Sequence, residues 1–352
     1  MPFKILSLPA RHPYMRKFND GVNIEFVNPD TDLFSQQQYD PEVIQAKYPP
    51  ESYNIVHIHF SFDVVPIDRF RNLLEYFRSV QKPIIWTTHS LECQRIKGYG
   101  NGEYQKLLFD YADKLISPTE GCKKYILEKY GKHKRDIDVI PLGFMISPGD
   151  VERIKKGISK DKNLFTILIA DFRENREVIQ SVINFLQCST LNDCKLQLIY
   201  KPINPYKSST NDLNEVMITF YELTQNPRII NVSLPFIPNE LITEAFLKSH
   251  AIILPYKWGT HSGQIEQAKD CGCHVVVTDV GYYKEQWDKI NTWSIADNKV
   301  EEFPTRYTNC LMEVYKKEPL KPAGYSRQEE LQRIIQQHVV VYKNLISTHE
   351  QK

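Results

Sequence analysis

The chain lacks the segments that would place it in or across a membrane. Its apolar runs, such as Ala251-Ile252-Ile253-Leu254, are far shorter than the ~20 residues that cross a bilayer. The N-terminal residues MPFKILSLPARHPYMRKF have no long apolar stretch before a small-residue cleavage site, and we interpret their apolar part as a first strand. We therefore expect a cytoplasmic protein whose only membrane contact is peripheral, at the inner face.

The chain also lacks a large net charge and cysteines at the spacing of metal ligands. The 44 Lys+Arg and 43 Asp+Glu leave a net charge of +1, so no overall field attracts nucleic acid, which we do not expect as a partner. The 7 cysteines show no metal-ligand spacing, and a chain of 352 residues does not depend on disulfides. We expect reduced thiols, no metal and no cofactor. The hydrophobic share of 41% predicts a chain that folds throughout.

Short β-rich runs alternate with helical stretches in both halves, which is typical of parallel sheets covered by helices. The strands expected in the first half are Lys4–Leu8, Ile55–Phe60, Ile84–Thr88, Lys114–Ser117 and Asp138–Ile140. Those expected in the second half are Phe165–Ala170, Lys195–Tyr200, Ile229–Ser233, Ala251–Leu254 and His274–Thr278. The prediction is an α/β protein with two doubly wound, Rossmann-like domains facing a cleft.

The domain boundary is expected near Ser147-Pro148-Gly149-Asp150, before a lysine-rich stretch. This predicts a first domain over residues 1–147 and a second over residues 148–320. Residues 321–352 contain apolar side chains at helical spacing within Arg327–Ile346, which predicts a long amphipathic helix that must dock on another surface. Because ligands of such sheets bind at the carboxyl ends of the strands, site residues should directly follow strands.

Two arginines follow the first strand of the second half. Arg173 and Arg176 lie three residues apart where a helix is expected to begin. Guanidinium groups suit phosphate oxygens, and a helix N-terminus adds donors and partial positive charge, so a diphosphate would fit here. The alternative is a solvated turn in which the arginines pair with Glu174 and Glu177.

The segment Pro255–Ala268 has the order strand, polar loop, Ser-Gly and helix. Ser262 is placed to cap the helix, and Gly263 lets a ligand approach the backbone N–H groups of the first turn. Such an arrangement accepts an anion. It is also a common α/β connection, and both interpretations stay open.

Histidines dominate the candidate residues of the first half. His57 and His59 alternate onto one face of a strand; the pair is more typical of a satisfied core than of a zinc site, because no third ligand is visible. His89 follows a strand directly, which favours a functional role, and His12 beside Arg16 is a weaker candidate.

The segment Gly121–Arg135, GCKKYILEKYGKHKR, is strongly basic. It suits either an anionic membrane surface or an anionic acceptor, and its alternative role is that of a solvated helix end.

Three segments of the first half are similar to sequence motifs that occur together in one enzyme family. Ile55–Phe60 with Asp63 is similar to "DVVHxH", and Trp86-Thr87-Thr88-His89 is similar to "TxH". Ala112–Ser117 followed by Val139–Gly143 is similar to "AD…S…VIPNG".

Two segments of the second half continue the series. Ala170–Arg176 is similar to "GxxRxxKG", with Arg176 in the lysine place, and Ser262–Val276 is similar to "SGxLxEAxAxGxPVV". In this order, the five segments resemble a GT-B glycosyltransferase, most closely the family-4-like enzymes that use nucleotide sugars. The resemblance runs from the first strand to about Gln286.

The resemblance implies a UDP- or GDP-type sugar donor and a glycan or lipid-linked acceptor in surface polysaccharide synthesis, with the C-terminal helix crossing back to the first domain. It implies a metal-independent hexosyl transfer, in the retaining mode. The residues it assigns to the donor diphosphate are Arg173, Arg176, Ser262, Gly263 and Gln264. Those assigned to the donor sugar or nucleotide are Tyr256, Thr260, His261 and Gln267. The catalytic candidates are His89 and Glu266, and the acceptor side is expected near His12 and Arg16.

The sequence departs from the family at the paired glutamates of its retaining members. Counted back from Gly272, the two places hold Gly259 and Gln267, and Glu266 lies one residue from the second place. An inverting transferase with His89 as general base, or a GT-B-shaped protein that binds glycans or sugar nucleotides without transfer, are therefore the alternatives.

Overall fold

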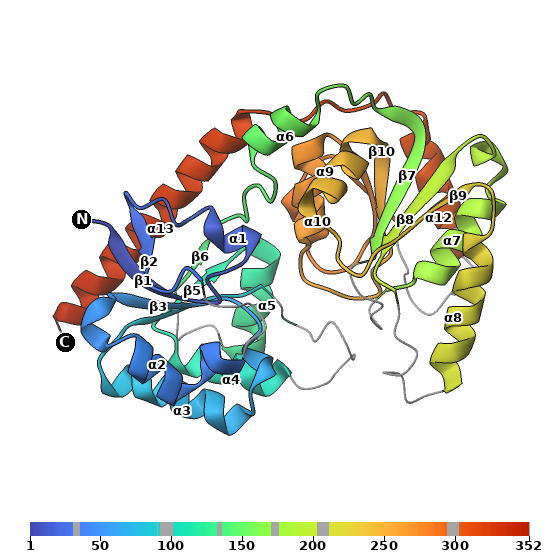
Figure 1. Cartoon of the computed structure of the whole chain (residues 1–352). Helices are drawn as coiled ribbons and strands as arrows, with labels where there is room; N and C mark the ends of the chain where they lie inside the picture. Colours follow the sequence, from blue (N-terminus) through green and yellow to red (C-terminus); the bar gives the residue numbers. More distant parts are fainter. Residues whose placement is uncertain are drawn as a thin grey trace. The chain divides into compact units, whose positions relative to one another are not determined.

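The computed structural model describes residues 1–30, 36–89, 91, 101–131, 136–169, 176–202, 211–293 and 303–351. The chain divides into two compact units. Unit 1 contains Met1–Cys93, Gly98–Met145 and Gln328–Lys352, and unit 2 contains Gln94–Lys97 and Ile146–Arg327. Figure 1 shows the elements of both units.

Unit 1 is built on a six-stranded sheet of order β2-β1-β3-β4-β5-β6 in which every neighbouring pair is parallel. Its strands are β1 (Phe3–Leu8), β2 (Ile24–Phe26), β3 (Ile55–Ile58), β4 (Ile84–Thr87), β5 (Lys114–Ser117) and β6 (Ile137–Val139). Its α-helices before the C-terminal one are α1 (Pro13–Arg16), α2 (Pro41–Lys47), α3 (Ile67–Ser79), α4 (Asn101–Tyr111) and α5 (Glu120–Tyr130), with 3-10 turns η1 (Gln36–Tyr39), η2 (Pro50–Ser52) and η3 (Phe62–Val64).

Unit 2 repeats this architecture with a parallel sheet of order β12-β11-β10-β7-β8-β9. Its strands are β7 (Asp161–Ile169), β8 (Lys195–Tyr200), β9 (Ile229–Ser233), β10 (Ser249–Leu254), β11 (His274–Thr278) and β12 (Ile290–Trp293). Its helices are α6 (Pro148–Ile154), α7 (Val178–Gln187), η4 (Ser189–Leu191), α8 (Asn211–Thr224), α9 (Asn239–Lys248), α10 (Gly263–Cys271), α11 (Tyr283–Gln286) and α12 (Phe303–Tyr315). The expected fold class, two Rossmann-like α/β domains, is confirmed.

The C-terminal helix α13 (Ser326–Glu350) belongs to unit 1 from Gln328 onward. Its apolar stripe is buried in one core with the sheet residues Ile5, Ile55 and Ile85. In Figure 1 the helix lies along one face of the first sheet, while α2, α3 and α4 cover the other. The surface on which the predicted amphipathic helix docks is therefore the first domain.

The sequence located most of the strands, but it missed β2 and β12, the outer strands of the two sheets, with three and four residues. Short outer strands carry too few residues for an alternating pattern. Within the described residues, no helix has the length and apolar character needed to span a membrane.

Candidate functional site

The N-terminus of α10 lies directly after the β10 strand end and is capped as expected. The Ser262 hydroxyl accepts a hydrogen bond from the Gln264 amide at 3.2 Å, and Gly263 is the first helical residue. The helix stops at Gly272, whose φ of +66° is the left-handed conformation that favours glycine. This helix therefore points its free first turn toward the carboxyl edge of the sheet.

A side chain that the sequence did not single out holds this helix start in place. The Gln286 side chain accepts a hydrogen bond from the Ser262 amide at 2.7 Å and donates one to the Ser262 carbonyl at 3.1 Å. Because one side-chain amide binds both the N–H and the carbonyl of the cap residue, it fixes the direction of the first turn. Gln286 stands in no motif, so only the fold brings it here.

Arg176 lies beside this helix start, at the end of β7. Its guanidinium donates to the Leu168 carbonyl at 3.0 Å and lies 5.2 Å from the centre of the Tyr256 ring. The Tyr256 hydroxyl is 3.2 Å from the Ser262 hydroxyl, and Gln264 also donates to the Leu168 carbonyl, at 3.3 Å. Four of the residues expected at the donor site, Arg176, Tyr256, Ser262 and Gln264, therefore converge. Arg173 lies outside the described residues.

Two buried polar atoms of these residues make no hydrogen bond within the protein. Among the described residues, the Nε of Arg176 and the Oε1 of Gln264 are buried without a hydrogen-bond partner. Buried polar atoms are normally satisfied, so an unpaired N–H donor next to a helix N-terminus fits a ligand that brings its own oxygens.

The other residues expected at the donor lie in the same segment. Thr260 is buried, and its carbonyl accepts a hydrogen bond from the Tyr282 amide at 2.9 Å. Burial lowers the pKa of His261 to about 4, so its imidazole is neutral at neutral pH. Gln267 is half-buried on α10. The donor assignments of these three residues stay predictions.

Glu266, a catalytic candidate, has both carboxylate oxygens engaged. One oxygen lies 2.7 Å from the Arg327 guanidinium, and the other accepts from Gln286 at 3.1 Å. Arg327 also binds Asp270 at 2.7 Å, and Asp270 in turn accepts from the Ile146 amide at 2.9 Å. All three charged side chains are buried, at 2–4% residue exposure. Both oxygens of Glu266 are thus engaged within the protein, and its catalytic role stays a prediction.

Gly259, at the first glutamate place of the family pattern, has no room for a side chain. A Cβ atom built there would lie 2.0 Å from the Tyr283 hydroxyl, and Tyr283 is 2% exposed. The space that a side chain at this place would take is therefore occupied by a buried tyrosine.

The candidate histidines of the first half form one cluster in unit 1. His57 lies between the Tyr342 hydroxyl and the Thr87 hydroxyl, at 2.8 Å from each. His59 Nδ1 lies 3.4 Å from His89 Nε2. The pKa values of His57 and His59 lie well below the ordinary value, mainly because both rings are buried and to a smaller extent because other histidines are close. Both side chains are buried, at 1% exposure, and among the described residues no group of three or more His, Cys, Asp or Glu could hold a metal ion.

His89 and His12 follow the carboxyl ends of β4 and β1, and His89 is in contact with this cluster through His59. His89 packs edge-on against Tyr14, with ring centres 4.7 Å apart, and keeps 8% of its surface exposed. His12 caps α1 by accepting from the Tyr14 amide at 3.1 Å, and burial lowers its pKa to about 4. Arg16, in the same short helix, is exposed. Their catalytic and acceptor roles stay predictions.

The family model for Glycosyltransferase Family 4 matches residues 25–146. No curated protein sequence matches the chain. Among solved structures, sucrose-phosphate synthase from Thermosynechococcus elongatus is similar with a TM-score of 0.60 at 16% identity, covering 87% of this chain and 76% of the other.

Two further structures match over nearly their whole length. The Anabaena protein HepE, solved in complex with UDP, has a TM-score of 0.56 at 12% identity, with 99% of each chain covered. A glycosyltransferase from Rickettsia africae has a TM-score of 0.56 at 13% identity, covering 98% of this chain and 99% of the other. At such identities the structures show a shared fold. With the family model on the first domain, they confirm that the chain has the GT-B fold and resembles the family-4-like glycosyltransferases.

Proposed function

We propose that this protein transfers a glycosyl residue, of hexosyl type, from a nucleotide-sugar donor to a glycan or lipid-linked acceptor. The observation that carries the proposal is the convergence of Arg176, Tyr256 and Gln264 on the capped N-terminus of α10. The match of residues 25–146 to Glycosyltransferase Family 4 supports the reaction class. HepE, which shares the fold, was solved with UDP, and this makes a UDP-type donor the first to test.

The proposed donor site suits a diphosphate for electrostatic reasons. The Ser262 amide is taken by Gln286 and the Gln264 amide by the Ser262 hydroxyl, so among the described first-turn amides Gly263 offers the N–H for a ligand oxygen. The Arg176 Nε adds a charged donor beside it. During glycosyl transfer, negative charge builds up on the leaving diphosphate, and fixed donors aimed at that charge lower the barrier. In this proposal the residues of unit 2 stabilise the leaving group.

The residues at the two glutamate places of the family pattern bear on whether transfer is retaining or inverting. Gly259 is covered by Tyr283, Gln267 cannot ionise, and Glu266 is held by Arg327. We keep retention as the first proposal from the family resemblance, and these three positions favour testing the inverting and non-catalytic alternatives directly. The anomeric configuration of the product, read by NMR, separates retention from inversion. Donor binding without transfer or hydrolysis would favour a binding protein.

The first experiment is thermal melting of the full chain with UDP, GDP, ADP, CDP and their sugar conjugates at millimolar concentration. A ligand at about 100 times its dissociation constant adds roughly 2.7 kcal/mol of stability. A selective shift with one nucleotide supports the donor site, and no shift with any of them contradicts it.

The variant Arg176→Gln assigns that shift to the proposed site. Losing a charged hydrogen bond to phosphate should cost on the order of 1.5–3 kcal/mol, or about ten- to a hundredfold in affinity. Lys248→Ala is the matched control, because this lysine ends α9 just before β10 begins, at the opposite edge of the sheet. Unchanged nucleotide affinity in Arg176→Gln, with Lys248→Ala also unchanged, would contradict the phosphate assignment.

A role in surface polysaccharide synthesis at an anionic membrane face is the finer part of the proposal. It rests on Lys123, Lys124 and Lys129 along α5, the described part of the basic segment. Co-sedimentation with liposomes, with and without anionic lipid, tests it. No binding to either would leave a glycan acceptor in solution.

A further inference from the structure

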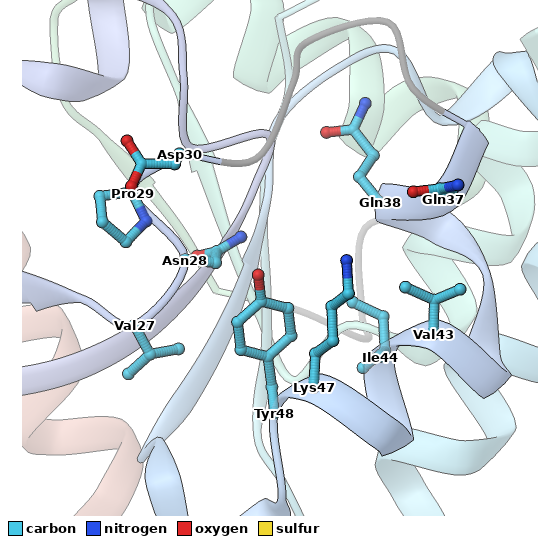
Figure 2. Close-up of a pocket in the computed structure, with 10 residues that line it drawn as sticks. All are labelled: Val27, Asn28, Pro29, Asp30, Gln37, Gln38, Val43, Ile44, Lys47 and Tyr48. Carbon is cyan, nitrogen blue, oxygen red and sulfur yellow. The ribbon is translucent and has the colours of Figure 1, made fainter.

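Unit 1 contains a cavity that the residues discussed so far do not line. It has a volume of about 390 Å³ and lies at the carboxyl end of β2, between the segment that follows this strand and the elements η1 and α2 (Figure 2). β2 pairs in parallel with β1, so the cavity opens at the same sheet edge as His12 and Arg16, which follow β1. Its volume falls in the range of ordinary ligand pockets.

The walls of this cavity are held by hydrogen bonds that need no ligand. The Asn28 side chain accepts from the Ser7 amide at 3.0 Å and donates to the Ser7 carbonyl at 2.7 Å, which fixes the segment after β2 to β1. The buried Tyr39 hydroxyl ties η1 to the Leu8 and Phe60 carbonyls, at the ends of β1 and β3. A preformed site spends little binding energy on ordering itself, so weak individual contacts suffice for affinity.

Helix α2, which forms the opposite wall, is fixed at its start. The Asp40 carboxylate caps it by accepting from the Glu42 amide at 3.0 Å and also binds Arg69 of α3 at 2.9 Å. The start of α2 is therefore tied to a neighbouring helix by contacts that need no ligand.

The lining combines opposite charges, amides and an aromatic ring. The charged side chains among the described lining residues are Lys47 and Asp30, whose charges cancel. Gln37 and the buried Gln38 add amide groups, each with a donor and an acceptor. Figure 2 shows the Lys47 amine and the Tyr48 hydroxyl both pointing into the space between the two walls. Among these described residues the two formal charges balance, so this part of the lining offers no excess positive charge to a phosphate group.

Apolar side chains complete the wall beside these polar groups. Val27, Val43 and Ile44 line the cavity and offer surface for C–H groups. A sugar ring presents this same combination: hydroxyl groups around its rim, which donate and accept at once, and C–H groups on its faces.

We propose that this cavity is a subsite for a neutral sugar residue of the acceptor glycan, at a distance from the hydroxyl that reacts. The inference rests on the proposed glycosyl transfer for its acceptor, but its binding chemistry is separate from the donor site in unit 2. In this proposal the amides, Asp30 and Lys47 bind the ring hydroxyls, and the apolar wall with Tyr48 contacts the ring face. An acceptor longer than one sugar is therefore preferred to a monosaccharide.

Saturation-transfer NMR on the full chain tests the subsite without any donor. The probes are methyl glycosides and β- and α-linked disaccharides of glucose, galactose, mannose and N-acetylglucosamine. We expect at least one disaccharide to bind, and the double variant Gln37→Ala/Lys47→Ala to weaken it at least tenfold. Both side chains are exposed, so the fold should not change. Gln45→Ala, an exposed amide on α2 outside the cavity lining, is the matched control and should bind normally.

A second variant, Val43→Phe, fills the cavity without removing a charge and should block the same disaccharide. Equal binding by the wild-type chain and both cavity variants would overturn the subsite, and so would the absence of binding across the panel. The proposed function is judged independently by the nucleotide shifts and by Arg176→Gln. If nucleotides raise the melting temperature but no saccharide binds, only the subsite is refuted. If a saccharide binds but no nucleotide raises the melting temperature, only the donor site is refuted.

Discussion

The buried ion group around Arg327 gives the sharpest test of the structure. Arg327 is 2% exposed and lies between the carboxylates of Glu266 and Asp270, at 2.7 Å from each. In Arg327→Met, two buried carboxylates lose the cation that lies between them. Breaking a buried ion pair by removing one partner costs about 3–5 kcal/mol, because the remaining charge stays desolvated. We expect a loss of this size in the stability of unit 2.

The chain offers a matched control in which one arginine again bridges two carboxylates, but in solvent. Arg153 lies 3.2 Å from Asp150 and 2.9 Å from Glu240, with 57% of its side chain exposed. Exposed ion pairs are screened by water, so Arg153→Met should change stability little. Both variants are compared by urea unfolding.

Tryptophan fluorescence in a Trp86→Phe background isolates the signal of unit 2, because the other three tryptophans, Trp258, Trp287 and Trp293, all belong to that unit. Equal losses in Arg327→Met and Arg153→Met would refute the reasoning from burial.

A third variant separates lost charge from lost packing. Arg327→Met/Glu266→Gln/Asp270→Asn removes all three charges while keeping the amide acceptors for Gln286 and the Ile146 backbone. It should recover part of the stability lost in Arg327→Met. If the triple variant is no more stable than the single one, unpaired charge is not the cause.

Two further predictions concern acid stability and the space at Gly259. Burial lowers the pKa of His338 to about 4, so the unfolded chain takes up this proton first, and unit 1 should lose about 3 kcal/mol from this group as the pH falls from about 6.5 to 4. The urea midpoint of His338→Met should fall less steeply over that range, and parallel curves would contradict it. Gly259→Ala should lower the melting temperature because its Cβ meets the Tyr283 hydroxyl at 2.0 Å, whereas Gly102→Ala, with nothing within 4 Å, should not lower it. Equal melting temperatures would show that Tyr283 can move away.

The sequence by itself determined the fold class and the approximate positions of most strands. Alternating β-rich and helical runs are local patterns, so strands such as Lys195–Tyr200 and Ile229–Ser233 have the same bounds in the structure as in the prediction. The Ser262 cap and the Gly272 stop are also local, because each depends on residues within one helical turn.

Tertiary structure alone decided which of the candidate residues meet. Arg176 and Gln264 share the Leu168 carbonyl although they lie 88 residues apart in the sequence, a pairing that the parallel order of β7 and β10 creates. Gln286 and Arg327 carry no motif, yet they hold Ser262 and Glu266. A residue's partners across a sheet depend on strand order and burial, which no spacing along one chain encodes. For the same reason, the sequence alone did not show that Arg327 and Gln286 bind the carboxylate of Glu266.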